Sequence, residues 1–167
     1  MPSGNLNLPQ VGEKGFEMEL LASNYLREQG YQIIHGGTIS TMESRQWRKK
    51  YGKLSGEYWS EEKRKKFDYV KSLRKKLGIN SSLYDYLCKK GKLYFLFEIK
   101  YKIWKEGRKH FNSSERQIRE YNRVHKEDKI QVKVLTIIRK DQKLSYHIYD
   151  WDDFEKTKTM IKLKKIE

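Results

Sequence analysis

Cysteine and proline are scarce in this 167-residue chain, which contains one of the first and two of the second. The single cysteine, Cys88, excludes an intramolecular disulfide, a four-cysteine zinc site and an iron–sulfur cluster ligated by the cysteines of one chain. The sequence also lacks an apolar run long enough for a membrane-spanning helix, and its first ten residues lack the pattern of a secretory signal. We therefore expect a cytoplasmic protein with no membrane partner.

Acidic residues are the minority among the charged side chains. The 37 basic residues outnumber the 22 acidic residues by 15, and this excess favours polyanionic partners. Because the sequence has neither a membrane span nor a basic amphipathic segment with a clean apolar face, nucleic acid is the expected partner. A hydrophobic fraction of 37% over this length fits one domain with a single core.

The positive charge is concentrated between residues 45 and 76, which include thirteen basic and four acidic residues, a net charge of +9 (13 minus 4). Ser60 as an N-cap, followed by apolar residues at helical spacing, predicts a helix over 61–77. The aromatic residues of this segment have two interpretations: anchors in the core, which we favour, or platforms on which bases stack. The basic residues suit contacts with phosphates. As candidates for nucleic-acid binding we select Arg48, Lys49, Lys50, Lys63, Arg64, Lys65 and Lys66.

Hydrophobic periodicity predicts the other elements of secondary structure. Helices are expected over 14–29 and from 113 or 114 to about 125, and strands over 31–35, 81–91 (with its turn), 93–101, 130–138 and 144–149. This order predicts an α/β fold with a mixed central β-sheet flanked by helices. We divide the chain into a flexible N-terminus (1–12), a single domain (13–155) with a basic insert at about 42–80, and a lysine-rich tail (156–167).

The segment 93–101, LYFLFEIKY, is the most informative strand. Its apolar and aromatic residues indicate burial on both faces, and alternation places Glu98 and Lys100 on the same face. Asp85 lies thirteen residues before Glu98 (98 minus 85), on the other strand of a predicted hairpin. One alternative is a surface ion pair of Glu98 and Lys100, which contributes little to stability. At the end of a buried strand, however, the charges need a partner or a metal ion to offset their desolvation.

Asp85 and Glu98 are hard oxygen ligands of the kind that bind Mg²⁺ or Mn²⁺, and the carbonyl oxygen of Ile99 is a further candidate ligand. Lys100 would position the attacking water and stabilise the charge that develops on a phosphate. Glu19 lies on the flank of the apolar stripe of the first helix, from where it could complete the site through a water. Its alternative role is that of a solvated acid near the positive end of the helix.

Gln117 belongs to the helix expected after 113 and also has two interpretations. It lies three residues after Ser114, which fits a capping box in which the glutamine reaches back to the helix start. It also shares a helix face with Tyr121, four residues further on.

Three motifs resemble the PD-(D/E)xK nuclease superfamily, in particular archaeal Holliday junction resolvases and RecB-like nucleases. GFEMELLASNYLREQGYQII resembles the first helix and strand of the family, SLYDYLCKKGKLYFLFEIKYK resembles its catalytic hairpin, and QIREY resembles its Q-x-x-x-Y pattern. The resemblance implies a restriction-endonuclease-like core, from about residue 14 to residue 149. It assigns catalysis to Asp85, Glu98, Lys100, Glu19 and Gln117, metal binding to Asp85, Glu98 and Ile99, and contact with the substrate phosphate or the metal to Gln117 and Tyr121.

The sequence departs from the family pattern at several points. Tyr84 stands where a proline commonly precedes the catalytic aspartate of the family. Asp68 in the insert is an alternative to Asp85 as the first acidic residue of the motif. The basic insert is unlike a minimal resolvase and suggests a particular substrate or a recognition element. The single cysteine disfavours the RecB-like exonucleases that carry an iron–sulfur cluster.

From these residues we expect a hydrolase, namely a Mg²⁺- or Mn²⁺-dependent DNA endonuclease that is structure- or site-specific. A homodimer would provide the two cuts that a duplex or a junction requires. Two alternatives remain: a non-catalytic basic nucleic-acid-binding protein, and a single-strand exonuclease of the same fold. Stabilisation by magnesium tests the first alternative, and circular against linear substrates tests the second.

Overall fold

The structure is a computed structural model that describes residues 13–36, 61–80, 83–104, 110–127 and 129–164. Its helices are α1 (Glu13–Glu28), α3 (Glu61–Leu77), α4 (Glu115–Lys126) and the short 3-10 helix η3 (Trp151–Asp153). Its strands are β1 (Gln32–Gly36), β2 (Tyr86–Lys90), β3 (Leu93–Ile103), β4 (His110–Asn112), β5 (Gln131–Lys140), β6 (Lys143–Asp150), β7 (Phe154–Lys156) and β8 (Met160–Leu163).

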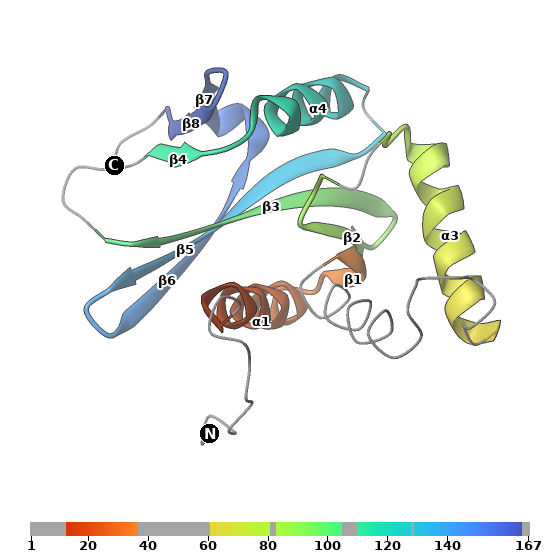
Figure 1. The fold of residues 1–167 in the computed structure, drawn as a ribbon, viewed down its shortest axis with the longest axis horizontal. Coiled ribbons are helices and arrows are strands. Elements are labelled where there is room, and N and C mark those ends of the chain that lie inside the picture. The colour runs from red at the N-terminus through yellow and green to blue at the C-terminus, as the bar shows by residue number, and fades with distance from the viewer. Residues whose placement is uncertain (1–12, 37–60, 81–82, 105–109, 128, 165–167) are drawn as a thin grey trace, which may run out of the picture.

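Five strands form the central sheet in the order β1-β2-β3-β5-β6. β3 and β5 are parallel, whereas the other neighbouring pairs are antiparallel. The chain passes through α4 between β3 and β5, since parallel neighbours need a crossover connection. α1 and α4 lie on opposite faces of the sheet, and α3 stands at one end of it (Figure 1). The expected α/β fold with a mixed central sheet flanked by helices is therefore confirmed.

Two apolar clusters fill the space on either side of this sheet. Phe95, Phe97 and Ile99 of β3 pack in the cluster that includes residues of α1. Leu96 of the same strand packs in the other cluster, with residues of α3 and α4. The predicted burial of this strand on both faces is confirmed, and its alternation directs neighbouring side chains into different layers.

The helix predicted over 61–77 is α3, with the same bounds. Its Val70, Leu73 and Leu77 are buried, whereas Phe67 is 47% exposed and Tyr69 is 53% exposed. The favoured interpretation of the aromatic residues as core anchors is therefore wrong for these two, because they belong to the half of α3 that precedes its buried residues. The basic helix keeps most of its charged side chains at the surface.

β4, β8 and β7 form a second, three-stranded antiparallel sheet that was not predicted from the sequence. β4 lies in a stretch for which no helix or strand was predicted, and β8 lies within the expected lysine-rich tail. Strands of three or four residues contain too few positions for an alternating pattern to be recognised. Phe111, Phe154 and Ile161 are nevertheless buried, and they join this sheet to the cluster beneath α4.

In the part of the chain that the structure describes, no helix is long and apolar enough to cross a membrane.

Candidate active site

Asp85 lies immediately before β2, at the point where the β2–β3 ladder ends. The last residue pair of the ladder is Tyr86 with Phe97. The backbone N–H of Asp85 donates to the carbonyl of Phe97 (3.1 Å), and its Oδ2 accepts from the backbone N–H of Ile99 (2.7 Å). The carboxylate thus provides the acceptor that a longer β2 would have offered to Ile99. This contact fixes Asp85 beside Glu98, the residue before Ile99.

The environment of Asp85 disfavours its negative charge. Burial, followed by the charge of Glu98, raises the pKa of Asp85 to about 8, and the Ile99 N–H and the Lys100 ammonium only partly oppose this effect. Glu98 itself is 3% exposed. Two carboxyl groups that share a site with little water cannot both ionise easily unless a cation offsets their charge. The pair is therefore suited to binding a cation.

Glu98 lies on the face of β3 that α4 covers, and three donors surround it. Its Oε2 accepts from the hydroxyl of Tyr121 (2.5 Å) and from Nε2 of Gln117 (3.3 Å). Its Oε1 forms an ion pair with Nζ of Lys100 (3.0 Å). Buried carboxylates need such partners, and here the partners also fix the orientation of the carboxylate.

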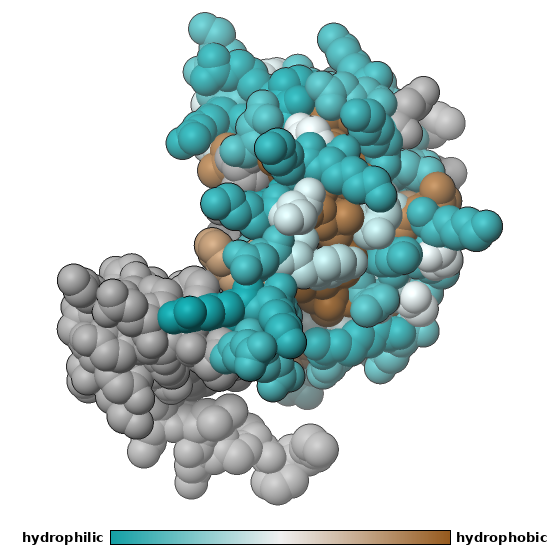
Figure 2. Space-filling view, turned by 90° about the vertical axis from the view of Figure 1, so that its right-hand side faces the viewer, coloured by the Kyte–Doolittle hydropathy of each residue, from teal (hydrophilic) through white to brown (hydrophobic). Residues whose placement is uncertain are grey.

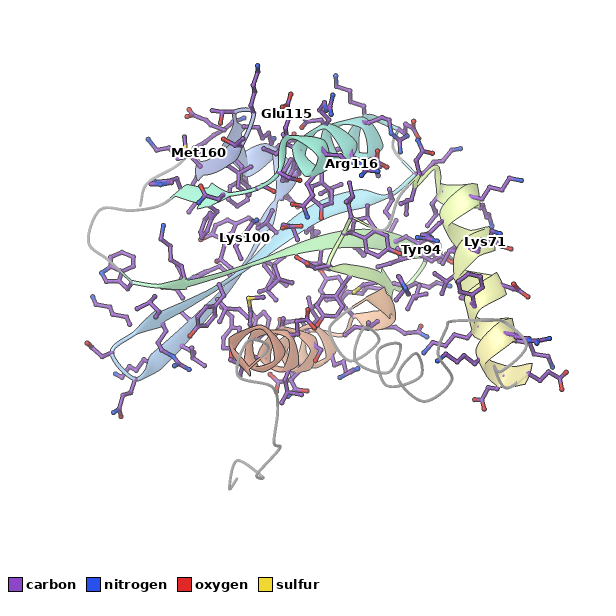
Figure 3. The ribbon with its side chains drawn as sticks, in the orientation of Figure 1. Lys71, Tyr94, Lys100, Glu115, Arg116 and Met160 are labelled. Carbon is purple, nitrogen blue, oxygen red and sulfur yellow. The ribbon has the colours of Figure 1, made fainter. Side chains whose placement is uncertain are left out.

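Lys100 follows Glu98 on the same face of β3, as alternation predicts. Its ammonium also donates to the carbonyl of Asn112 in β4 (2.6 Å), and its side chain is 14% exposed. Figure 3 shows Lys100 between the central sheet and the layer that contains α4 and the small sheet. The small sheet therefore helps to hold the lysine in the site.

Gln117 contacts both the start of α4 and Glu98. Ser114 is the N-cap of α4, and its side chain accepts from the backbone N–H of Gln117 (3.1 Å). The side chain of Gln117 accepts from the hydroxyl of Ser113 (3.1 Å) and donates to the carbonyl of Leu83 (2.8 Å) as well as to Glu98. It therefore links the start of α4 to the segment before Asp85.

The prediction that Tyr121 contacts nucleic acid is not supported by its position. Tyr121 is 1% exposed, so a base or a phosphate cannot reach its ring. Burial, together with the charge of Glu98, raises the pKa of Tyr121 well above its usual value, which keeps the hydroxyl protonated as a donor to Glu98. Tyr121 positions Glu98 from within the core.

Glu19 belongs to α1, on the opposite face of the sheet from α4. The hydroxyl of Tyr86 donates to the backbone carbonyl of Glu19 (3.0 Å), which ties this turn of α1 to the first residue of β2. The charge of Glu19 also contributes, as the smallest of the causes, to the raised pKa of Asp85. Glu19 thus lies within electrostatic range of Asp85, and its role through a water stays a prediction, as does the role of the Ile99 carbonyl.

Gly36 and the pair His35 and Tyr84 belong to the site but were not selected from the sequence. A Cβ built on Gly36 would lie 2.0 Å from the carbonyl oxygen of Asp85, and the φ of Gly36 is +115°. Only glycine allows β1 to approach Asp85 so closely. The available sequence signal is the pair Gly36-Gly37 after the predicted strand 31–35, and such a pair by itself indicates only a turn.

Tyr84, at the position of the family's proline, connects the hairpin to its surroundings. Its hydroxyl lies 2.7 Å from Nδ1 of His35 and is also hydrogen bonded to Arg74 of α3. Burial, followed by the charge of Arg74, lowers the pKa of His35 and so favours its neutral ring. Burial raises the pKa of Tyr84 to about 12, which keeps its hydroxyl protonated. The basic helix is thereby attached next to Asp85.

The candidate contacts for nucleic acid fall into two groups. Arg64, Lys65 and Lys66 are exposed on α3 and Lys63 is partly exposed, whereas residues 48–50 lie outside the described residues. Figure 2 views the side of the molecule on which α3 stands, and most of the described surface there is hydrophilic. Asp68, the alternative to Asp85 as the first acidic residue of the motif, is exposed on the same helix. The structure brings Asp85, and not Asp68, to Glu98.

In the described ranges, no group of three or more His, Cys, Asp and Glu side chains is arranged to hold a metal ion. Asp85 and Glu98 are two such side chains. A two-carboxylate site is sufficient for Mg²⁺, which usually keeps several of its waters and takes one or two carboxylates from the protein. The donor set at the end of the hairpin therefore fits this class of ion.

Comparison with known proteins gives a similarity of fold. No family model and no curated protein matches the chain. Among solved structures, the fold is similar to that of Hjc, a Holliday junction resolvase from the archaeal hyperthermophile Archaeoglobus fulgidus. The alignment covers 89% of this chain and 84% of that chain, with 14% sequence identity and a TM-score of 0.43. This similarity concerns the fold alone.

Proposed function

We propose that the protein is a divalent-metal-dependent deoxyribonuclease that hydrolyses phosphodiester bonds within DNA strands. The observation that carries the proposal is the grouping of Asp85, Glu98 and Lys100 at one end of the β2–β3 hairpin. Asp85 is bonded to the backbone of β3, and Lys100 is paired with Glu98. These are the residues on which the sequence resembles the PD-(D/E)xK superfamily.

Asp85 and Glu98 would hold the metal ion, Mg²⁺ or Mn²⁺, with the carbonyl of Ile99 as a third protein ligand. When bound, the ion supplies an activated water and offsets negative charge on the phosphate. Its positive charge would also lower the raised pKa of Asp85, because it would offset the effect of burial and, after it, that of the Glu98 charge. The fit rests on two hard oxygen donors, of which Glu98 is buried and Asp85 is half-buried.

The protein's own groups have distinct roles in this proposal. Nζ of Lys100, held between Glu98 and Asn112, donates a hydrogen bond to the attacking water or to a phosphoryl oxygen. Gln117 and Tyr121 hold the Glu98 carboxylate in one orientation. Glu19 would support the site from the α1 side through a water. Pre-organised groups of this kind reduce the rearrangement that the transition state needs.

The experiment is a cleavage panel on duplex, junction, flap and single-stranded DNA, each with magnesium and with manganese. We expect Asp85→Asn and Glu98→Gln to remove cleavage while DNA binding without metal is retained. Asp68→Asn is the matched control for the first variant, because it removes one exposed carboxylate of the same type outside the site. Equal cleavage by the wild type and both site variants would refute the assignment.

Magnesium binding is measured separately, as the shift in thermal unfolding temperature on addition of the ion. A ligand that binds only the folded state stabilises it by mass action, so the wild type and Asp68→Asn should gain stability. Asp85→Asn and Glu98→Gln should gain much less. Binding of DNA without cleavage of any substrate and without this gain would identify a non-catalytic nucleic-acid-binding protein.

Two further properties follow as predictions of the same proposal. Cleavage of circular as well as linear single-stranded DNA is expected of an endonuclease, whereas an exonuclease requires an end. Cleavage of both strands of a duplex or junction is expected to involve a homodimer. Light scattering of the protein with and without DNA tests this prediction, and a monomer in both states would refute the homodimer.

A further inference from the structure

A hollow of about 280 Å³ lies on the surface between α4 and the two residues Asn80 and Leu83. Its wall is formed by Asn80, Leu83, Arg116, Arg119, Glu120 and Arg123. Three arginines and one glutamate give this wall a net charge of +2 (3 minus 1) at neutral pH. The hollow is outside the group formed by Asp85, Glu98 and Lys100, and none of its charged residues was a candidate from the sequence.

Arg123 and Glu120 form the structural part of the wall. Arg123 pairs with Glu120 (2.7 Å), and its guanidinium also donates to the carbonyl of Gly78 (2.6 Å) and to Glu127 (2.9 Å). Glu120 in addition accepts from the backbone N–H of Asn80 (3.2 Å). These bonds connect α4 to the end of α3, and they leave no unshared positive charge on Arg123.

Arg116 and Arg119 differ from Arg123 in this respect. Both are exposed, and within the described part of the chain neither side chain forms a hydrogen bond or an ion pair. The hydrogen bond from Arg123 and, to a smaller extent, the charge of Arg116 lower the pKa of Glu120, so that its charge remains committed to Arg123. Two guanidinium groups are left facing one concave surface, and guanidinium groups bind phosphate in a bidentate manner.

The hollow is joined to the candidate active site through Leu83. The carbonyl of Leu83 accepts from Nε2 of Gln117 (2.8 Å), and the same nitrogen lies 3.3 Å from Oε2 of Glu98. Arg116 precedes Gln117 on α4, and Arg119 follows it within one helical turn, about 5.4 Å along the helix axis. Figure 3 shows Arg116 on α4 and Lys100 beneath that helix. A strand that enters the active site would therefore pass close to the hollow.

We propose that Arg116 and Arg119 form a subsite for one phosphate of the DNA strand, next to the phosphodiester that lies at Asp85 and Glu98. This inference rests on the proposed nuclease function for the identity of the neighbouring site. The subsite fixes the path of the strand along α4, on the side toward α3. Its ligand is a phosphate within a polynucleotide chain.

The test measures binding of a labelled single-stranded oligonucleotide without divalent metal, so that no cleavage is needed. One phosphate at a time is replaced by an uncharged methylphosphonate. In the wild type, neutralising the phosphate that occupies the subsite should weaken binding about tenfold, the size expected for one charge-assisted contact. In the double variant Arg116→Gln/Arg119→Gln, the loss at that position should disappear while losses at other positions remain.

The control variant is Lys143→Gln/Lys158→Gln, which removes two charges from exposed residues, one at the start of β6 and one between β7 and β8. It should keep the wild-type pattern of losses. A second arm adds inorganic phosphate and a nucleoside monophosphate as competitors, and neither should displace the oligonucleotide when present at equal concentration. Displacement that depends on Arg116 and Arg119 would show that the hollow binds free phosphate. It would overturn the proposal that the hollow binds a phosphate of the DNA strand.

The outcomes for the subsite and for the nuclease are separable. If Arg116→Gln/Arg119→Gln shows the same position-dependent losses as the wild type, the subsite is wrong, even where cleavage is observed. If the expected pattern is found but the wild type cleaves no DNA with either metal, the subsite stands and the nuclease function is wrong. Circular dichroism of each variant at the assay temperature establishes that the comparison is made on folded protein.

Discussion

The side chain of Asp85 binds the backbone N–H of Ile99 at 2.7 Å, across the end of the β2–β3 ladder. The same carboxylate thus accepts a hydrogen bond that continues the β2–β3 ladder and is a candidate ligand of the metal ion. The two roles are compatible because a carboxylate has about four acceptor positions, of which the N–H uses one. A change at Asp85 is therefore expected to affect both the hairpin and the chemistry.

The first prediction concerns the pH dependence of stability in the metal-free protein. Asp85 has an ordinary pKa of 3.8 and a folded-state pKa of about 8. Between these values the folded protein holds a proton that the unfolded chain releases. The contribution of this group is thus complete below about pH 4, and stability falls as the pH rises toward about 8. The slope for one proton is at most about 1.4 kcal/mol per pH unit.

This prediction is checked by chemical denaturation across that pH range in the presence of a chelator. Asp85→Asn should flatten the dependence of stability on pH, because an amide does not titrate. The amide oxygen can still accept the hydrogen bond from the backbone N–H of Ile99. Asp68→Asn should leave it unchanged. Excess magnesium should oppose the decline in the wild type. A wild-type profile as flat as that of Asp85→Asn would show that Asp85 is ionised throughout.

The second prediction concerns Gly36. In Gly36→Ala the new Cβ would lie 2.0 Å from the backbone oxygen of Asp85, and a backbone atom cannot move aside without displacing the hairpin. We expect a loss of several kcal/mol in stability, in the upper range for single substitutions, together with loss of cleavage. The measurement is the free energy of unfolding, with catalytic rate determined under conditions where the variant is folded.

Gly91→Ala is the matched control for this variant. Gly91 also has a positive φ, +61°, but a Cβ there has no neighbouring atom within 4 Å. Its substitution should cost only the backbone strain, about 1 kcal/mol, and should leave the cleavage rate per folded molecule unchanged. If both variants lose the same stability and activity, the close approach of β1 to Asp85 has no special importance.

The sequence predicted the central elements well because they are long and strongly patterned. Leu96 and Phe97 enter different clusters as alternation requires, and α3 has the expected bounds. The small sheet escaped detection because each of its strands has only three or four residues, too few for a period to emerge. Its presence matters for the site, since β4 supplies the Asn112 carbonyl that binds Lys100.

The role of individual site residues was less predictable. The segment QIREY lies in a helix, as predicted, and its Gln117 and Tyr121 both face Glu98. Sequence spacing does not reveal, however, that Tyr121 is buried. The close approach of Gly36 to Asp85 depends on the register of β1 against β2, which includes an irregularity after Ile33. Such a register is set by the folded sheet and has no local signature.

The third prediction concerns the hydroxyl of Tyr121. Tyr121→Phe retains the buried ring and removes one of three donors to Glu98. We expect a stability loss of about 1 kcal/mol, typical of one hydrogen bond, and a fall in kcat with little change in KM, because the side chain of Tyr121 is enclosed in the core. Tyr69→Phe on exposed α3 is the control and should change neither. A rise in KM with unchanged kcat would indicate contact with the substrate.

The last prediction concerns the basic helix. Replacement of Lys63, Arg64, Lys65 and Lys66 by glutamine should weaken DNA binding to a similar degree for unrelated sequences, since these side chains would meet phosphates. On duplex DNA the slope of log K against log salt should decrease by about 0.9 for each phosphate that the variant no longer neutralises. The comparison is a variant in which exposed Lys143, Lys158, Lys162 and Lys164 are replaced, so that the net charge falls equally. If the two variants show the same slope, overall charge and not α3 accounts for the affinity.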